Sequence, residues 1–139
     1  MKHEHKILLI GIIAVGLLDA VGSIASRQFD FDYTQLTFVS VIVYGTTTFL
    51  ATRLKNLKTG VLYGMILGFF DSTIGLKISL LLGANTGDSN YEITPAFWIF
   101  IVVYMIGFGA LVGLMGGGLA RIVKKKRSTN PQPRDVVRR

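Results

Sequence analysis

The chain has no cysteine, and only two histidines and three prolines among its 139 residues. Without cysteine it can form no disulfide, thiolate metal site, iron–sulfur cluster or cysteine nucleophile. His3 and His5 precede the first apolar stretch, so that stretch and the later ones offer no histidine for a haem, a zinc ion or a Ser-His-Asp triad. The glycines at 116–118 lie inside an apolar stretch and form no phosphate-binding motif. We therefore expect a protein that is not an enzyme and has no cofactor or bound metal.

Charged residues are also few, because they make up 17% of the chain whereas hydrophobic residues make up 50%. The mean hydropathy of +0.52 is high for a soluble domain. Charge is nearly absent from four stretches, at about 7–25, 36–52, 61–83 and 95–122, which approach the ~20 residues that cross a bilayer. Thr94 followed by Pro95 is typical of a helix start. The predicted fold is all-α, a four-transmembrane-helix bundle over 7–123, with a short N-terminus at 1–6 and a basic disordered tail at 124–139.

Basic residues gather on one side of this arrangement. The N-terminus, the connection between the second and third stretches, and the tail together carry 13 Lys and Arg, whereas the two opposite loops carry only Arg27. This asymmetry predicts a multi-pass protein of the plasma (inner) membrane with both termini in the cytoplasm. The net charge of +7 then reflects topology, so we expect the lipid bilayer as partner and no nucleic acid. One alternative is that the first stretch, which ends in Ser23-Ile24-Ala25, is a cleaved signal peptide.

The two halves of the sequence resemble each other. The segment GLLDA at 16–20 matches GFFDS at 68–72, and a glycine and a serine follow each aspartate at similar distances. These residues are Gly22 and Ser26 in the first half, and Gly75 and Ser79 in the second. In the following helices, Val43-Tyr44 matches Val103-Tyr104. We therefore expect two parallel-repeated helical hairpins, related by an axis along the membrane normal.

Asp19 and Asp71 are the candidate functional residues. Both lie near the middle of a predicted span, about 18 Å and 15 Å from its start at 1.5 Å per residue. A carboxylate there costs at least ~2.5–3.5 kcal/mol, which suggests a compensating role. We expect the pair to bind a cation or protons, with Ser72 and Lys77 as further candidates. The alternative is structural: each aspartate caps a broken helix, bonds across the bundle or pairs with Lys77, whose other choice is to extend to the membrane interface.

Glycines recur every four residues in the third and fourth stretches. They are Gly60, Gly64 and Gly68 in one, and Gly109, Gly113 and Gly117 in the other. Small residues at this spacing let helix backbones approach closely, so we expect these two stretches to pack on each other. A contact between copies of the chain, or a flexible gate at 116–118, is the alternative.

These features predict a small transport or permeation unit with a cation or proton site at Asp19 and Asp71. Four helices rarely enclose a path, so we expect a homo-oligomer or a larger membrane complex. The competing hypothesis is a non-catalytic accessory or assembly subunit, in which the aspartates only hold helices together. Tyr33 and Trp98 are interpreted as interfacial anchors. No motif is specific enough to assign a family.

Overall fold

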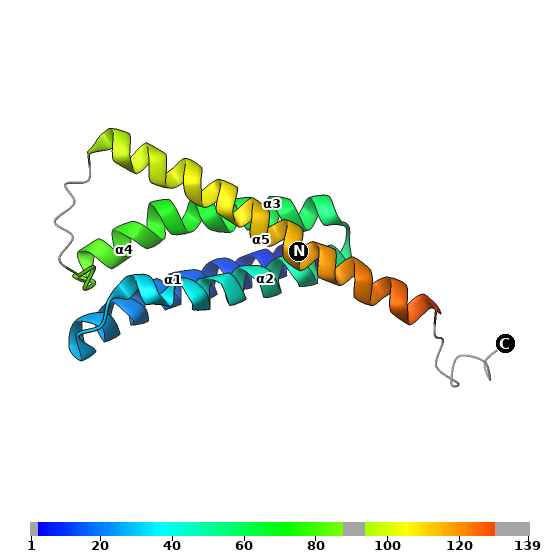
Figure 1. Ribbon diagram of the computed structural model, residues 1–139, viewed down its shortest axis with the longest axis horizontal. Coiled ribbons are helices and arrows are strands. Elements are labelled where there is room, and N and C mark those ends of the chain that lie inside the picture. Colours follow the sequence, from blue (N-terminus) through cyan, green and yellow to red (C-terminus); the bar gives the residue numbers. More distant parts are fainter. Residues whose placement is uncertain (1–2, 88–93, 130–139) are drawn as a thin grey trace.

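The computed structural model describes residues 3–87 and 94–129, which contain helices and no strand (Figure 1). The long helices are α1 (His3–Phe29), α2 (Thr37–Leu54), α3 (Leu57–Phe70) and α5 (Pro95–Thr129). A 3₁₀ turn, η1 (Tyr33–Leu36), leads into α2, and a π-helical turn, η2 (Asp71–Gly75), joins α3 to the short α4 (Leu76–Leu81). Counting α3, η2 and α4 as one, four helices are long and apolar enough to cross a membrane. The all-α prediction with four long apolar helices is confirmed.

The helices extend beyond most of the predicted boundaries. α5 begins at Pro95 as predicted, and the backbone N–H of Phe97 donates to the Thr94 hydroxyl at 3.3 Å. Its other end continues through the basic residues to Thr129, although the sequence predicted a disordered tail from 124. The rest of that tail, from 130, lies outside the described residues, as do Asp88 and Glu92 of the sequence between the third and fourth stretches.

The bundle has two chemically different ends. The connection between α2 and α3 and the last turns of α5 lie at one end, which we call the basic end because Arg53, Lys58 and Arg121 are there (Figure 1). The turn after α1 and the residues that follow α4 lie at the other end, which we call the acidic end after Asp30 and Asp32.

The main cluster of the core is a layer to which four helices each contribute one buried side chain, and Ala51, Tyr63 and Ala120 are buried outside it. Val15 of α1, Tyr44 of α2, Leu67 of α3 and Val112 of α5 form this cluster. Most other large apolar side chains are exposed along the outside of the bundle. This pattern, with a thin core and an apolar exterior, is the one expected of helices that face lipid.

α3 and α5 approach each other backbone to backbone through the two glycine series. A Cβ on Gly64 would overlap the carbonyl oxygen of Gly109, and one on Gly68 would overlap that of Met105. A Cβ on Gly113 would lie 2.9 Å from the Cα of Val61. The outer members of the series differ, because Gly60 and Gly117 both face Thr52 of α2. The glycines therefore pack within the chain.

The start of α5 diverges from the rest of the bundle near the acidic end. α5 packs along α2 and α3 but comes close to neither α1 nor α4 (Figure 1). A groove of about 430 Å³ separates it from α4 there, lined by Leu76, Lys77, Leu80, Pro95 and Trp98. The bundle is thus tight at its basic end and open at its acidic end.

Candidate functional site

The two helices that carry an aspartate end in the same way. After α1, Asp30 has a left-handed backbone (φ 53°) and the N–H of Phe31 donates to the carbonyl of Ser26 at 3.2 Å. After α4, Gly83 is left-handed (φ 66°) and the N–H of Ala84 donates to the carbonyl of Ser79 at 3.0 Å. Both are Schellman motifs, with the serine as the acceptor three positions before the cap. The serines matched in the sequence therefore have matching positions in the structure.

The π turn accommodates a difference of one residue between the halves. Ser26 follows Asp19 by seven positions, whereas Ser79 follows Asp71 by eight. A π turn closes its hydrogen bonds over one residue more than an α turn, so η2 can take up the extra residue without rotating the helix that follows. Ser72, Gly75 and Ser79 accordingly all remain buried. The turn begins at Asp71 itself, which places the irregularity at the carboxylate.

The carboxylates of Asp19 and Asp71 converge on Gly75. A Cβ on Gly75 would overlap Oδ2 of Asp19 and lie 3.0 Å from Oδ1 of Asp71. The two oxygens are therefore no more than about 5 Å apart, a distance at which two carboxylates interact strongly. Glycine at this position is required by the close approach, because any side chain would displace Asp19. Asp19 is only 2% exposed.

Each carboxylate receives one hydrogen bond from a tyrosine. The Tyr33 hydroxyl donates to Oδ1 of Asp19 at 2.7 Å and itself accepts from the Ser79 hydroxyl at 2.9 Å. The Tyr44 hydroxyl donates to Oδ2 of Asp71 at 2.7 Å. Oδ2 of Asp19 is buried and has no hydrogen-bond partner. Among the described residues, no basic side chain forms an ion pair with either aspartate.

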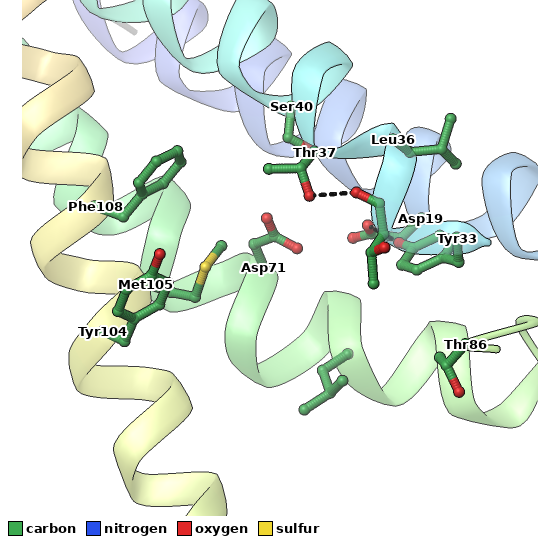
Figure 2. Close-up of a pocket in the computed structure, with 12 residues that line it drawn as sticks. Asp19, Tyr33, Leu36, Thr37, Ser40, Asp71, Thr86, Tyr104, Met105 and Phe108 are labelled. Atoms are coloured by element: carbon green, nitrogen blue, oxygen red, sulfur yellow. Dashed lines mark hydrogen bonds between the residues drawn. The ribbon is translucent and has the colours of Figure 1, made fainter. Parts of the chain in front are cut away.

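Both carboxylates line one cavity of about 370 Å³ (Figure 2). Asp19, Tyr33 and Thr37 lie on one side of it, Asp71 lies between, and Tyr104, Met105 and Phe108 of α5 lie opposite. The remaining lining residues are Thr34, Leu36, Ser40, Leu76 and Thr86. None of the lining residues is basic. The cavity can therefore hold a positively charged group but offers no counter-charge to an anion.

The acidic end adds negative charge near this cavity. Asp32 is half-buried and directly precedes the lining residue Tyr33. Hydrogen bonds from the backbone and the hydroxyl of Thr34 hold the pKa of Asp32 below its ordinary value, so this carboxylate stays ionised at neutral pH. A cation that approaches from this end meets a favourable potential.

Ser72 and Lys77 do not join the aspartate pair. The Ser72 hydroxyl donates to the carbonyl of Gly68 at 2.8 Å, within its own helix, and its carbonyl accepts from the indole N–H of Trp98 at 3.2 Å. The ammonium of Lys77 lies 5.9 Å from the centre of the Trp98 ring, in the groove between α4 and α5. Lys77 therefore contacts an aromatic face and neutralises neither carboxylate.

The sequence interpretation missed the two tyrosines. Tyr33 was expected to be an interfacial anchor, but its hydroxyl points into the bundle and links Asp19 to Ser79. For Tyr44 the sequence predicted only a place in the internal repeat, as the counterpart of Tyr104. A signal was available for Tyr44, because a tyrosine in the middle of an apolar helix needs a hydrogen-bond partner for its hydroxyl. No such signal distinguishes Tyr33 from an anchor at a helix start.

No protein-family model, curated protein or solved structure matches this chain. The site is therefore interpreted from its geometry and chemistry.

Proposed function

We propose that this chain is a four-span protein of the plasma (inner) membrane that serves as a small transport or permeation unit, with a cation or proton site between Asp19 and Asp71. The observation that carries the proposal is that carboxylates from two helices line one cavity and approach each other, and that no basic side chain among residues 3–87 and 94–129 pairs with either. The excess of Lys and Arg at the basic end supports a cytoplasmic location for that end and for both termini.

The unpartnered oxygen argues against a purely structural role for Asp19. A side chain that only joins helices has its buried oxygens satisfied, because an unsatisfied buried group costs about 1–3 kcal/mol. Tyr33 satisfies Oδ1, but Oδ2 faces Gly75 and Asp71 with no donor. A cation or proton held between the carboxylates would supply the missing partner and lower their repulsion.

The shape of the bundle supports access from the non-cytoplasmic side. The cavity lies toward the acidic end, where α5 diverges, whereas the glycine contacts of α3 and α5 close the basic half. Release to the cytoplasm then requires a rearrangement, as in alternating access, or a path formed between copies of the chain. We propose a homo-oligomer or larger complex for this reason.

The matching helix ends support an internal duplication. We propose that α1–α2 and α3–α5 are two parallel copies of one hairpin, with Asp19 equivalent to Asp71. Each copy ends in a Schellman motif, at Ser26 or Ser79. The π turn η2 accounts for the one extra residue between the aspartate and the serine in the second copy. A duplication would explain why two different helices each carry an aspartate at the same depth in the bundle.

Ion flux in reconstituted vesicles tests the proposed function. Asp19→Asn and Asp71→Asn keep the side-chain volume but remove the charge, so either should reduce cation-dependent or pH-dependent flux to the level of protein-free vesicles. Asp30→Asn is the control, because Asp30 is exposed and asparagine tolerates its left-handed backbone. Its flux should stay within about twofold of wild type, since salt screens exposed charges.

Two results would contradict the proposal. One is a folded wild-type protein that carries no flux above the background. The other is that both asparagine variants lose only expression or assembly while the protein that does fold retains its flux. Either result would favour the accessory-subunit hypothesis.

A further inference from the structure

The cavity that holds Asp19 and Asp71 is much larger than a site for a bare ion. Its volume of about 370 Å³ falls within the ~300–1,000 Å³ typical of pockets for small organic molecules. A divalent metal ion would need about six oxygen ligands. This cavity has two carboxylates, each with one oxygen already bound by a tyrosine, and the described residues contain no cluster of three His, Cys, Asp or Glu side chains.

The wall of the cavity opposite Asp19 consists of aromatic and thioether side chains. Tyr104 and Phe108 of α5 stack with their ring centres 6.4 Å apart, and Met105 lies beside them (Figure 2). Aromatic faces attract organic cations, and a thioether adapts to irregular apolar shapes. Tyr104 is 59% exposed, so its ring is available to a ligand.

The charged residues of the cavity determine the sign of the charge that a ligand can carry. Both carboxylates line the space and no lining residue is basic, whereas the unpartnered Oδ2 of Asp19 is buried against Gly75. A carboxylate or phosphate in the ligand would therefore meet only negative charge. An ammonium group in the cavity, by contrast, is attracted by both carboxylates while its apolar substituents contact Tyr104 and Phe108.

Resting on the proposed function, we propose that the ligand of this cavity is an organic ammonium ion with an apolar or aromatic body. The carboxylates of Asp19 and Asp71 bind the cationic nitrogen, and the α5 wall binds the body. A neutral molecule of the same shape gains only the second contact. Selectivity for the charge thus comes from the aspartates, and selectivity for the body comes from α5.

Binding of radiolabelled benzyltrimethylammonium to the purified full-length protein in micelles tests this inference by equilibrium dialysis. Wild type should bind the cation saturably, and neopentylbenzene at the same concentration, which has the same shape without the charge, should not displace it. Asp19→Asn should weaken binding at least about tenfold, as expected when a buried charge-assisted contact is lost.

A matched pair of variants tests the apolar wall without touching the aspartates. Tyr104→Leu should weaken binding about tenfold, because it removes the exposed aromatic face. Phe38→Leu should leave binding unchanged, because Phe38 is 78% exposed on α2 and does not line the cavity. If Asp19→Asn does not fold, as judged by helicity and gel filtration, this pair decides the question.

The outcomes separate this inference from the proposed function. Displacement by neopentylbenzene, or equal effects of Tyr104→Leu and Phe38→Leu, would overturn the ammonium site. Absence of binding together with aspartate-dependent proton flux would overturn it and leave the transport proposal standing, whereas absence of both would overturn both.

Discussion

Tyr33 and Tyr44 each donate a hydrogen bond to one of the two carboxylates, and they do so from different places. Tyr44 lies in the core layer on α2 and reaches Asp71 of the second hairpin. Tyr33 lies in η1, after the end of α1, and its hydroxyl lies between Asp19 and Ser79 of α4. Both hydroxyls thus connect the first half of the chain to the second, so they stabilise the interface as well as the charges.

Replacing Tyr44 by Phe should destabilise the fold. The variant leaves Oδ2 of Asp71 without a donor, which should lower the free energy of unfolding by about 1–3 kcal/mol. Tyr104→Phe is the control, because the Tyr104 ring is exposed, and it should change the free energy by less than about 0.5 kcal/mol. Unfolding in mixed micelles, followed by circular dichroism, measures both. Equal stability of the two variants would mean that another group satisfies Asp71.

The sequence identifies the acids of this site but not their donors. Asp19 and Asp71 were predictable because a charge inside an apolar run is costly and therefore conspicuous. The donors lie 14 and 27 positions away along the chain, and only the packing of the helices brings them near. Lys77 could not be assigned from its position either, since its contact is Trp98, which comes from a different helix.

At the level of the helices, the π turn is the feature that distinguishes the two hairpins. It inserts one residue between Asp71 and Ser79, and Ile74 is the half-exposed member of the turn. Without Ile74 the second half would read DSTG, where the first half reads DAVG at 19–22. The apolar pattern predicted one continuous helix over 61–83, because hydropathy does not distinguish a π turn from an α turn.

Deletion of Ile74 should convert η2 into an ordinary α turn and leave the fold intact. Ser79 would then follow Asp71 by seven positions, as Ser26 follows Asp19, so the melting temperature should stay within about 5 °C of wild type, on the order of 1 kcal/mol. Deletion of Ile66 is the matched control. It breaks the four-residue spacing of Gly64 and Gly68 against α5, so this variant should fail to fold. Helicity and thermal melting in micelles report both, and similar losses would refute the role assigned to η2.

The orientation of the whole molecule in the membrane can be tested with single cysteines, because the sequence contains no cysteine of its own. Gln28 and Lys58 are both exposed, near the acidic and basic ends respectively, and a single cysteine at either site would be the only thiol in the chain. An impermeant maleimide should label Gln28→Cys on intact cells, and Lys58→Cys only after the membrane is opened. The reverse pattern would place the cavity on the cytoplasmic side and contradict the proposed direction of access.

The divergence of α5 from α4 has a consequence for how a ligand would arrive. In the proposed orientation, the gap between these helices faces sideways, into the leaflet, and not only toward the extracellular water. An amphiphilic amine that dissolves among the acyl chains would then approach the bundle laterally, past Trp98 and the ammonium of Lys77, which lie in this groove. The fraction of protein with bound amine would then rise with the membrane–water partition coefficient of the amine. More hydrophobic amines would therefore bind at lower aqueous concentrations than hydrophilic amines of the same charge.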